Sequence, residues 1–447
     1  MEERPRVAVL GAGALGLAAA YRLLKMGYPT TVIEREGNLG GLAAGFPVGN
    51  TYLDRFYHHI FRTDREAVAL ITELGLGGDL LWLRPKTSIL HSGRQYQLDS
   101  PFSVLRFSPL SLVDRLRMGM AIAYLKVLQD HRPLEKHTAD SWLRRYMGGA
   151  AYEAVWRPQL AAKFGDRYAD ISMAWFWARV HDRTSSLGYL RGGFQALYDR
   201  LGEEIRRLGG ELRLGETVTG LAQLPDGAIA VGTARGQERF ARVLSTLPTR
   251  VTLHLAQGMP ADFRQKYEWG EAYGAQCMIL ALDRQLMLDN TYWLSVTEPG
   301  YPFMAVVEHT NMMPVAEYGG RHLVYLGNYL PMDDPLFSLP EADLLALFLP
   351  HLKRLNPAFE PAWVREHWLF RAPYAQPIVT RDFPLHIAPL HSPWPNLWLA
   401  SMFHVYPHDR GQNYSIALGN EVAKMVAAGA SELPDRPTRT AISVTPR

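Results

Sequence analysis

The chain has 447 residues, 47% of them hydrophobic and 20% charged, which is enough apolar material for a sizeable core spread over two or three domains. Its formal charge is only +3 and no basic tract accompanies it, so the composition argues against a nucleic-acid partner. Cys277 is the only cysteine, which excludes an intrachain disulfide and a cysteine-built metal cluster and favours a reducing, cytoplasmic compartment.

Residues 7–36 predict a dinucleotide-binding turn. An apolar run at 7–10 leads into a glycine-rich turn, a helix, a second apolar run at 31–33 and then Glu34. Gly11 permits the tight turn, Gly13 lets a pyrophosphate approach the backbone, and Gly16 lets the helix lie close to the strand. The diphosphate is expected on the first turn of that helix, where the residues are Gly11, Gly13, Ala14, Leu15 and Gly16.

Glu34 favours an adenosine ribose with both hydroxyls free. It stands 23 positions after Gly11, close to the spacing of about 20 expected for the ribose-binding acid. Its carboxylate would repel a 2′-phosphate, so NADP is disfavoured. Because the first strand starts at Val7, we expect no signal peptide ahead of it. The apolar run that continues to Ala20 is too short to span a bilayer of about 30 Å.

The residues after Glu34 separate FAD from NAD. Arg35 follows the acid, and Gly40, Gly41 and Leu42 come shortly after. With this pattern the chain resembles the FAD-dependent amine oxidase and protoporphyrinogen oxidase superfamily, which includes phytoene desaturases and UDP-galactopyranose mutases. There, a basic residue follows the acid and a Gly-Gly pair packs beside the pyrophosphate. The resemblance implies FAD as the cofactor; a plain surface turn is the alternative for the glycine pair.

The stretch from Tyr57 to Thr63 carries the resemblance toward the mutases. It is similar to their His-Ile-Phe-His-Thr segment, with Arg62 at a histidine position. The resemblance implies that His58 and His59 lie beside the flavin, where either could exchange a proton near neutral pH, and that Arg62 contacts substrate. The alternative is a histidine pair that only forms hydrogen bonds in the core.

Residues 109–178 read as largely helical, with helix starts near Ser111, Thr138 and Gly149. The stretch at 101–132 alternates apolar residues with more bases than acids. It predicts either peripheral membrane contact or an internal helix with exposed charges. The segment at 156–165 resembles a cavity-lining segment of related oxidases. There Arg157 and Lys163 could pair with an anionic substrate group, although a solvated helix face explains them equally well. The aromatics at 175–177 favour core over cavity.

The second half of the chain carries further similarity to the same superfamily. Gly209–Val218 resembles the strand that returns to the FAD domain, where Val218 would contact adenine, and 243–248 and 396–400 resemble later strands of that domain. Strands are predicted at 276–282, 292–296, 303–308 and 322–329, and a helix at 341–355. One departure is clear, because no acid follows the last strand, where Ser401–His404 stand instead.

The densest polar cluster precedes an alanine-rich helix predicted at 416–428. By resemblance this helix begins under the flavin ring. Tyr406 is taken as a catalytic wall of the substrate site, and Asp409 as a late source of the missing carboxylate. Asn413 has helix capping as its alternative role. Further expected contacts of this loop are Gly411, Asn413 and Tyr414 to the cofactor, and His404 and Arg410 to the substrate.

The predicted fold class is α/β, with a discontinuous, GR2-like Rossmann-type FAD-binding domain and an inserted α+β substrate domain. The FAD domain is placed at 1–85, 185–260 and 380–430, the substrate domain at 86–184 and 261–379, and a loose tail at 431–447. No metal site is expected, since neither HExxH nor a related spacing occurs.

The predicted function is an FAD-dependent oxidoreductase that passes a hydride from a small organic substrate to flavin N5. The substrate class stays open between an amine and a carbon–carbon bond of a polyprenyl, porphyrin-like or sugar-linked compound. A mutase-like enzyme acting without net redox and a non-catalytic flavin-bound scaffold remain as alternatives. The sequence does not indicate the electron acceptor or the oligomeric state.

Overall fold

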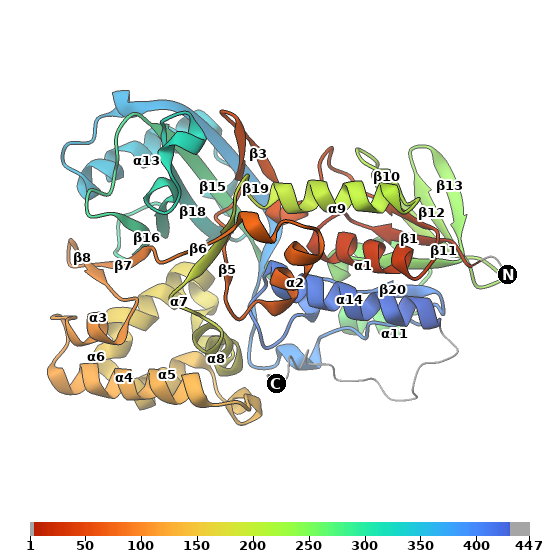
Figure 1. The fold of residues 1–447 in the computed structure, drawn as a ribbon. Helices are drawn as coiled ribbons and strands as arrows, with labels where there is room; N and C mark the ends of the chain where they lie inside the picture. The colour runs from red at the N-terminus through yellow and green to blue at the C-terminus, as the bar shows by residue number, and fades with distance from the viewer. Residues whose placement is uncertain (1–3, 430–447) are drawn as a thin grey trace.

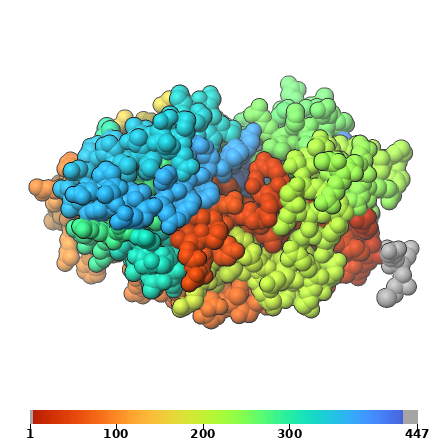
Figure 2. Space-filling view, turned by 90° about the horizontal axis from the view of Figure 1, so that it is seen from above, coloured from red at the N-terminus to blue at the C-terminus, as the bar shows by residue number. Residues whose placement is uncertain are grey.

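The computed structural model describes residues 4–429, so the tail predicted at 431–447 lies outside the described residues. The expected mixed α/β fold is confirmed, with one parallel sheet, one large mixed sheet and a group of helices (Figure 1). The two large sheets lie toward opposite ends of the molecule. In the space-filling view, the orange-red N-terminal segment reaches the surface between the blue and the yellow-green halves (Figure 2).

The parallel sheet gathers its five strands from three distant parts of the chain. Their order across the sheet is β10 (Glu211–Arg213), β2 (Thr30–Ile33), β1 (Val7–Leu10), β14 (Arg242–Ser245) and β20 (Leu397–Leu399). Every neighbouring pair is parallel. Because their carboxyl ends meet at one edge, the loops that follow β1, β2 and β20 lie close together there.

β1 is buried on both faces, which explains its unbroken apolar sequence. Val7 and Val9 belong to the core under the helices α1 (Ala14–Lys25), α9 (Gln195–Arg207), α14 (Gln412–Ala428) and α2 (Arg65–Glu73). Ala8 and Leu10 point to the opposite face and a separate core. The elements of that face are β11 (Val218–Gln223), β12 (Ile229–Thr233), β13 (Gly236–Phe240), α10 (Thr249–Leu255) and α11 (Ala261–Tyr267).

The second large sheet has seven strands, and residues 86–97 join it from the first quarter of the chain. Its order is β19 (Val364–Pro377), β15 (Ala272–Leu282), β18 (His322–Leu330), β17 (Ala305–Glu308), β16 (Thr291–Val296), β7 (Lys86–His91) and β8 (Arg94–Gln97). Only the β16–β7 pair is parallel. The helices α12 (Pro335–Ser338) and α13 (Glu341–Leu355) pack against it.

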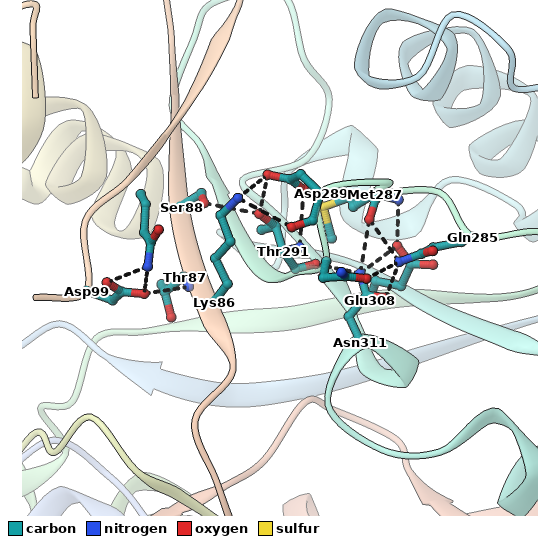
Figure 3. Close-up of polar contacts among 12 residues, drawn as sticks. Lys86, Thr87, Ser88, Asp99, Gln285, Met287, Asp289, Thr291, Glu308 and Asn311 are labelled. Atoms are coloured by element: carbon teal, nitrogen blue, oxygen red, sulfur yellow. Dashed lines mark hydrogen bonds and ion pairs between the residues drawn. The ribbon is translucent and has the colours of Figure 1, made fainter. Parts of the chain in front are cut away.

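A polar network fastens β7 to the later strands (Figure 3). Lys86 pairs with Asp289, and Ser88 Oγ lies 3.1 Å from Thr291 Oγ1 at the start of β16. Beside them the buried Glu308 accepts hydrogen bonds from the backbone of the 286–287 loop. The early segment is therefore held in this sheet by side chains as well as by strand pairing.

The helical group contains α3 (Pro101–Leu105), α4 (Leu112–Val127), α5 (Ala139–Met147), α6 (Gly149–Ala151), α7 (Arg157–Phe164) and α8 (Met173–His181). The predicted starts are confirmed, since Ser111 and Thr138 cap α4 and α5 and α6 begins at Gly149. The aromatics at 175–177 are at most 5% exposed, as expected for core residues. Among the helices of residues 4–429, none has both the length and the apolar character needed to cross a bilayer.

Two small sheets connect these parts. One is the hairpin of β3 (Gly45–Val48) and β4 (Thr51–Asp54), and the other has the order β5 (Ile60–Phe61), β9 (Leu187–Leu190), β6 (Leu80–Leu83). The predicted helix at 341–355 is confirmed to the residue. β15 begins at residue 272, four residues before the prediction, and α14 begins at Gln412, four residues before the predicted start.

Candidate active site

The turn between β1 and α1 leaves open space beside its backbone. Gly11 has a φ of +103°, and a Cβ at Gly16 would lie 2.0 Å from the carbonyl oxygen of Gly11, so both positions require glycine. A Cβ at Gly13, in contrast, would meet no atom within 4 Å. The first intrahelical bond runs from Leu17 N to Gly13 O at 3.0 Å, and no side chain caps α1. The N–H groups ahead of Leu17 can therefore bind an anion at the positive end of the helix dipole.

The second glycine pair lies directly on this turn. Gly40 donates its N–H to Ala12 O at 2.9 Å, and Gly40 and Gly41 have φ values of +108° and +58°. A Cβ at Gly41 would come within 3.1 Å of Gly13 Cα. Leu42 follows in a short 3-10 turn and is half-buried. The two glycine-rich segments thus form one continuous backbone surface at the edge of the parallel sheet.

Glu34 is fixed at the rim of this surface. Its Oε2 accepts from Ala12 N at 2.7 Å and its Oε1 from Glu36 N at 2.8 Å. Each oxygen keeps a further lone pair that can accept from a ribose hydroxyl. Arg35 is exposed and pairs with Glu36 at 3.1 Å, so its guanidinium faces solvent. Val218 opens β11 and is half-buried beside a β-bulge.

α14 runs alongside α1 and starts beyond it. A Cβ at Gly419 would lie 2.5 Å from Leu15 O, so glycine allows this close approach. Arg22 bonds Asn420 and Tyr28 bonds Ala427 O, which makes the two helices parallel. Leu15 is the second residue of α1 and Gly419 the eighth of α14, so α14 begins about six residues, roughly 9 Å, ahead of α1. Two helix N-termini are therefore stepped along one edge of the sheet.

A cation cluster lies beside the start of α14, where Lys163, Arg179 and Arg410 surround Asp409. Lys163 Nζ is 3.1 Å and Arg410 Nη1 3.6 Å from the Asp409 carboxylate, and Arg179 also donates to it. Burial alone would raise the pKa of Asp409, but the neighbouring cations outweigh it and hold that pKa below its ordinary value. The indole of Trp175 donates to the same carboxylate at 3.2 Å. Burial, together with the charge of Arg179, lowers the pKa of Lys163 well below its ordinary value, so Arg179 and Arg410 are the two fixed positive charges that share this negative charge.

The cation cluster extends to both sides. Arg410 donates to the Tyr329 hydroxyl at 2.6 Å and to the buried Gln376. Arg183 lies next to Arg179, and burial together with that charge lowers the pKa of Arg183 to about 10. Within residues 4–429, no carboxylate lies within 4.0 Å of Arg183. The excess of positive charge is suited to an anionic ligand.

His58 and His59 face the cation cluster with unpartnered ring nitrogens. In the described part of the chain, neither Nδ1 atom has a hydrogen-bond partner. Burial, with smaller effects of Arg410 on His58 and of Arg183 on His59, lowers the pKa of His58 to about 4 and of His59 to about 3. Both imidazoles are therefore neutral at pH 7 and can accept a proton or donate an N–H.

A buried histidine lies in the loop before α14, and an aromatic pair joins that loop to the first turn of α14. His404 Nδ1 accepts from Ser401 N at 3.0 Å while its Nε2 has no partner among the described residues, and burial lowers the pKa of His404 to about 4. Tyr414 donates to Asp182 at 2.7 Å and stacks on His408 with ring centroids 4.2 Å apart. Asp182 therefore ties this loop to the end of α8.

Four side chains predicted for the site are directed elsewhere, and a fifth predicted residue is an exposed glycine. Asn413 is 3% exposed, and its side-chain oxygen accepts from Glu66 N and Ala67 N, so it caps α2 and not α14, in whose first turn it stands. Tyr406 is 4% exposed and bonds Ser172 in the helical core, because the loop turns it inward. Arg62 is exposed over the ring of Trp82, and Arg157 pairs with Glu153 on the outer face of α7. Gly411 is exposed at the N-cap of α14.

The sequence patterns do not identify Arg179, Arg183 and Tyr329 as site residues. Trp175, Arg179 and Arg183 follow one another at intervals of four residues, which is a helical-face signal. The aromatic residues at 175–177 in the same segment instead indicate packing in the core. Tyr329 carried no signal, because its role depends on a strand that meets the loop of Arg410.

These residues fit a flavin dinucleotide. The open Gly13 position and the two uncapped helix starts would hold a diphosphate and a ring system in line, and the unpartnered nitrogens of His58, His59 and His404 supply donors or acceptors. Among residues 4–429, no group of three or more His, Cys, Asp or Glu side chains has the arrangement of a metal site.

Comparisons with known proteins agree with this fit. The family model for flavin-containing amine oxidoreductases matches residues 16–408. The mitochondrial protoporphyrinogen oxidase of Nicotiana tabacum is 28% identical over 172 residues, which cover 38% of this chain and only 34% of that protein.

Two solved structures match nearly the whole chain. A protoporphyrinogen oxidase-like protein of Exiguobacterium sp. 255-15 has a TM-score of 0.76 at 18% identity, covering 96% of this chain and 99% of that one. Reduced UDP-galactopyranose mutase has a TM-score of 0.75 at 16% identity, covering 98% of each chain. At these identities the structural likeness establishes the fold.

Proposed function

The chain belongs to the family of flavin-containing amine oxidoreductases, and from that premise we propose that it is an FAD-dependent enzyme that oxidises an anionic organic substrate. The observation that carries the substrate class is the cation cluster, in which Lys163, Arg179 and Arg410 have only Asp409 as a counter-ion among residues 4–429. A cationic amine would meet repulsion there. A carboxylate or phosphate would gain charge-assisted hydrogen bonds.

The cofactor is FAD in this proposal, and the dinucleotide follows the stepped helix starts. Gly11, Gly13 and Gly40 would hold the diphosphate and Glu34 the ribose, while the start of α14 would face the ring. Bound FAD supplies a hydride acceptor at N5. The parallel sheet with its glycine turn is then the Rossmann-type domain, and the seven-stranded sheet with the helical group forms the substrate domain.

The protein residues bind and orient the substrate and handle its proton. Arg179 and Arg410 would hold the anionic group, since both guanidinium groups are fixed in the cation cluster. Arg179 donates to Asp409, and Arg410 donates to the Tyr329 hydroxyl. His58 and His59 are neutral at pH 7 with pKa values of about 4 and about 3, so either would accept the substrate's proton once the bound anion offsets the nearby arginine charges and raises that pKa. His404 and Lys163 would shape the wall of the site.

A mutase-like function without net redox is the second candidate, and one comparison favours it. UDP-galactopyranose mutase covers the chain from end to end, and the diphosphate of a nucleotide sugar also suits the cation cluster. Such an enzyme would need reduced flavin but would show no net electron transfer.

Anaerobic mixing of the FAD-loaded protein with matched substrate pairs separates these functions. Each pair contains a carboxylate or phosphate compound and its neutral or amine analogue, and the readout is loss of the oxidised-flavin band near about 450 nm. Bleaching by anionic members only is expected. Turnover only after prior reduction, with no lasting bleaching, would establish the mutase-like function. A flavin that no compound reduces or uses would identify a scaffold.

Arg410→Gln provides the residue-level test. We expect a rise of at least tenfold in the substrate concentration needed for half-maximal bleaching, with unchanged flavin content, because one guanidinium contact is lost. Arg157→Gln is the matched control, since Arg157 lies on the same helix as Lys163 of the cation cluster but pairs with Glu153 on the outer face. Equal effects of the two substitutions would contradict the assignment.

A further inference from the structure

The helices α3 and α4 expose large apolar side chains to solvent. Of the fourteen large hydrophobic residues that are exposed in the described chain, eight lie between residues 102 and 127. They form what we call the α4 face: Phe102, Leu105, Leu112, Val113, Leu116, Met120, Tyr124 and Val127, with exposed fractions from 42% to 73%. In Figure 1, α3 and α4 lie along one outer edge of the molecule.

The spacing makes the α4 face a continuous stripe. Val113, Leu116, Met120, Tyr124 and Val127 follow one another at intervals of three or four residues, so they share one side of α4. The residues at 118, 121 and 125 lie on the opposite side and are buried in the helical core. α4 is therefore apolar on two sides, and only one of them is covered within the protein.

Arginines flank this stripe without acidic partners. Arg115 and Arg117 stand on either side of Leu116, about 100° away in each direction. Arg115 donates to the carbonyl of Leu110 at 2.8 Å, and Arg117 donates to the carbonyl of Tyr146 at 3.0 Å. These bonds to neutral groups fix the guanidinium positions but leave the charges uncompensated. Arg106 and Arg145 are also exposed, and in residues 4–429 neither lies within 4.0 Å of a carboxylate.

We propose that the α4 face docks this protein on the surface of a bilayer that contains anionic lipids. The apolar stripe would enter the boundary between headgroups and acyl chains, and the flanking arginines would meet lipid phosphates. The charge argues for a lipid surface over a second copy of the same face, because two copies related by a twofold axis would bring like-charged arginines together. This is docking in the plane of the interface, with no part of the chain crossing the bilayer.

The position of the α4 face gives the docking a use. Lys126 of α4 donates to the carbonyl of His181 at 3.3 Å and also to that of Arg183, at the end of α8. α8 carries Arg179 of the cation cluster. The docked face would therefore lie one helix away from the candidate active site, which suits a substrate or electron acceptor that is dissolved in the membrane.

Co-sedimentation of the FAD-loaded protein with vesicles tests the proposal. Vesicles of phosphatidylcholine alone are compared with vesicles that contain phosphatidylglycerol, and we expect at least tenfold tighter binding to the second kind. Raising the salt concentration from about 0.1 M to about 0.5 M should weaken that binding severalfold, because the arginine contribution is screened.

Val113→Glu with Met120→Glu places two charges in the centre of the stripe and should reduce vesicle binding at least tenfold. Leu288→Glu is the matched control, since Leu288 is 71% exposed but lies far along the chain in the loop between β15 and β16. Unchanged flavin absorbance and far-ultraviolet circular dichroism verify that the variants fold.

Two outcomes would overturn the proposal. One is vesicle binding that the double variant retains. The other is a wild-type protein that binds neither kind of vesicle. If that protein is then a dimer, and the double variant is a monomer, a second copy of the chain is the occupant of the α4 face.

Discussion

Replacing Gly13 with aspartate should stabilise the apoprotein while abolishing flavin binding. A Cβ at Gly13 meets nothing within 4 Å, and the residue has φ −76° and ψ 178°, which any side chain tolerates. Gly13 is also the N-cap of α1, and that helix has no side-chain cap. An aspartate there can accept a hydrogen bond from the first turn and complements the helix dipole.

The magnitude follows from these two effects. Aspartate at an N-cap is worth about 1 kcal/mol over alanine, and its charge adds roughly 0.3–1 kcal/mol. The FAD-free Gly13→Asp protein should therefore be about 1–2 kcal/mol more stable than FAD-free Gly13→Ala. The wild type gains about 2.7 kcal/mol from FAD at a hundred times its dissociation constant, and Gly13→Asp should gain nothing, because its carboxylate occupies and repels the diphosphate position.

Urea unfolding of each protein with and without added FAD, together with flavin absorbance of the purified proteins, measures both effects. Gly16→Ala is the contrasting variant, because its Cβ would lie 2.0 Å from Gly11 O and should destabilise the apoprotein itself. A Gly13→Asp protein that purifies with full flavin would refute the assignment of the cofactor to this turn. A Gly13→Asp apoprotein less stable than Gly13→Ala would refute the claim that space is open there.

Three further predictions concern the helices and charges around this site. Asp409→Asn leaves several cations without their shared counter-ion and should lower the free energy of unfolding by about 3 kcal/mol in urea titrations; an unchanged midpoint would speak against a buried ion cluster. His58 and His59 have folded-state pKa values of about 4 and about 3, so the unfolded chain takes up more protons below its own histidine pKa of about 6.5. Unfolding free energy should accordingly fall as the pH drops from about 6.5 towards 4, and the His58→Gln/His59→Gln double variant should flatten that slope; equal slopes would disprove it. Gly419→Val places a Cβ 2.5 Å from Leu15 O and must push α14 off α1, so the purified protein should lose most of its flavin, as its absorbance will report.

The parts predicted well from sequence are those set by neighbouring residues. The strand, glycine turn and acid of residues 7–34 specify their own geometry, because backbone freedom and helix capping act over a few positions. The helix at 341–355 is also predicted correctly from its local pattern. The predicted start of α14 is four residues too late because Gln412 is polar but buried. A pattern of apolar residues does not reveal a buried polar one.

Contacts between distant segments escaped prediction for a physical reason. Arg179 meets Asp409 across 230 positions, so nothing near either residue announces the pair. The same role, pairing with an anionic substrate group, is predicted for Arg157 and Lys163. Six positions on a helix correspond to about 240°, however, which places the two residues on different sides. Only Lys163 reaches the cation cluster, while Arg157 keeps to the outer face.

The parallel sheet has a consequence for how the protein is made. β20 supplies its edge strand from residues 397–399 and α14 supplies the second helix start from residue 412, so this binding surface is incomplete until the ribosome has released the chain beyond residue 412. The prosthetic group cannot load before that point, and shorter nascent chains carry exposed sheet edges that chaperones can bind. No N-terminal fragment ending before that last helix could be expected to turn yellow.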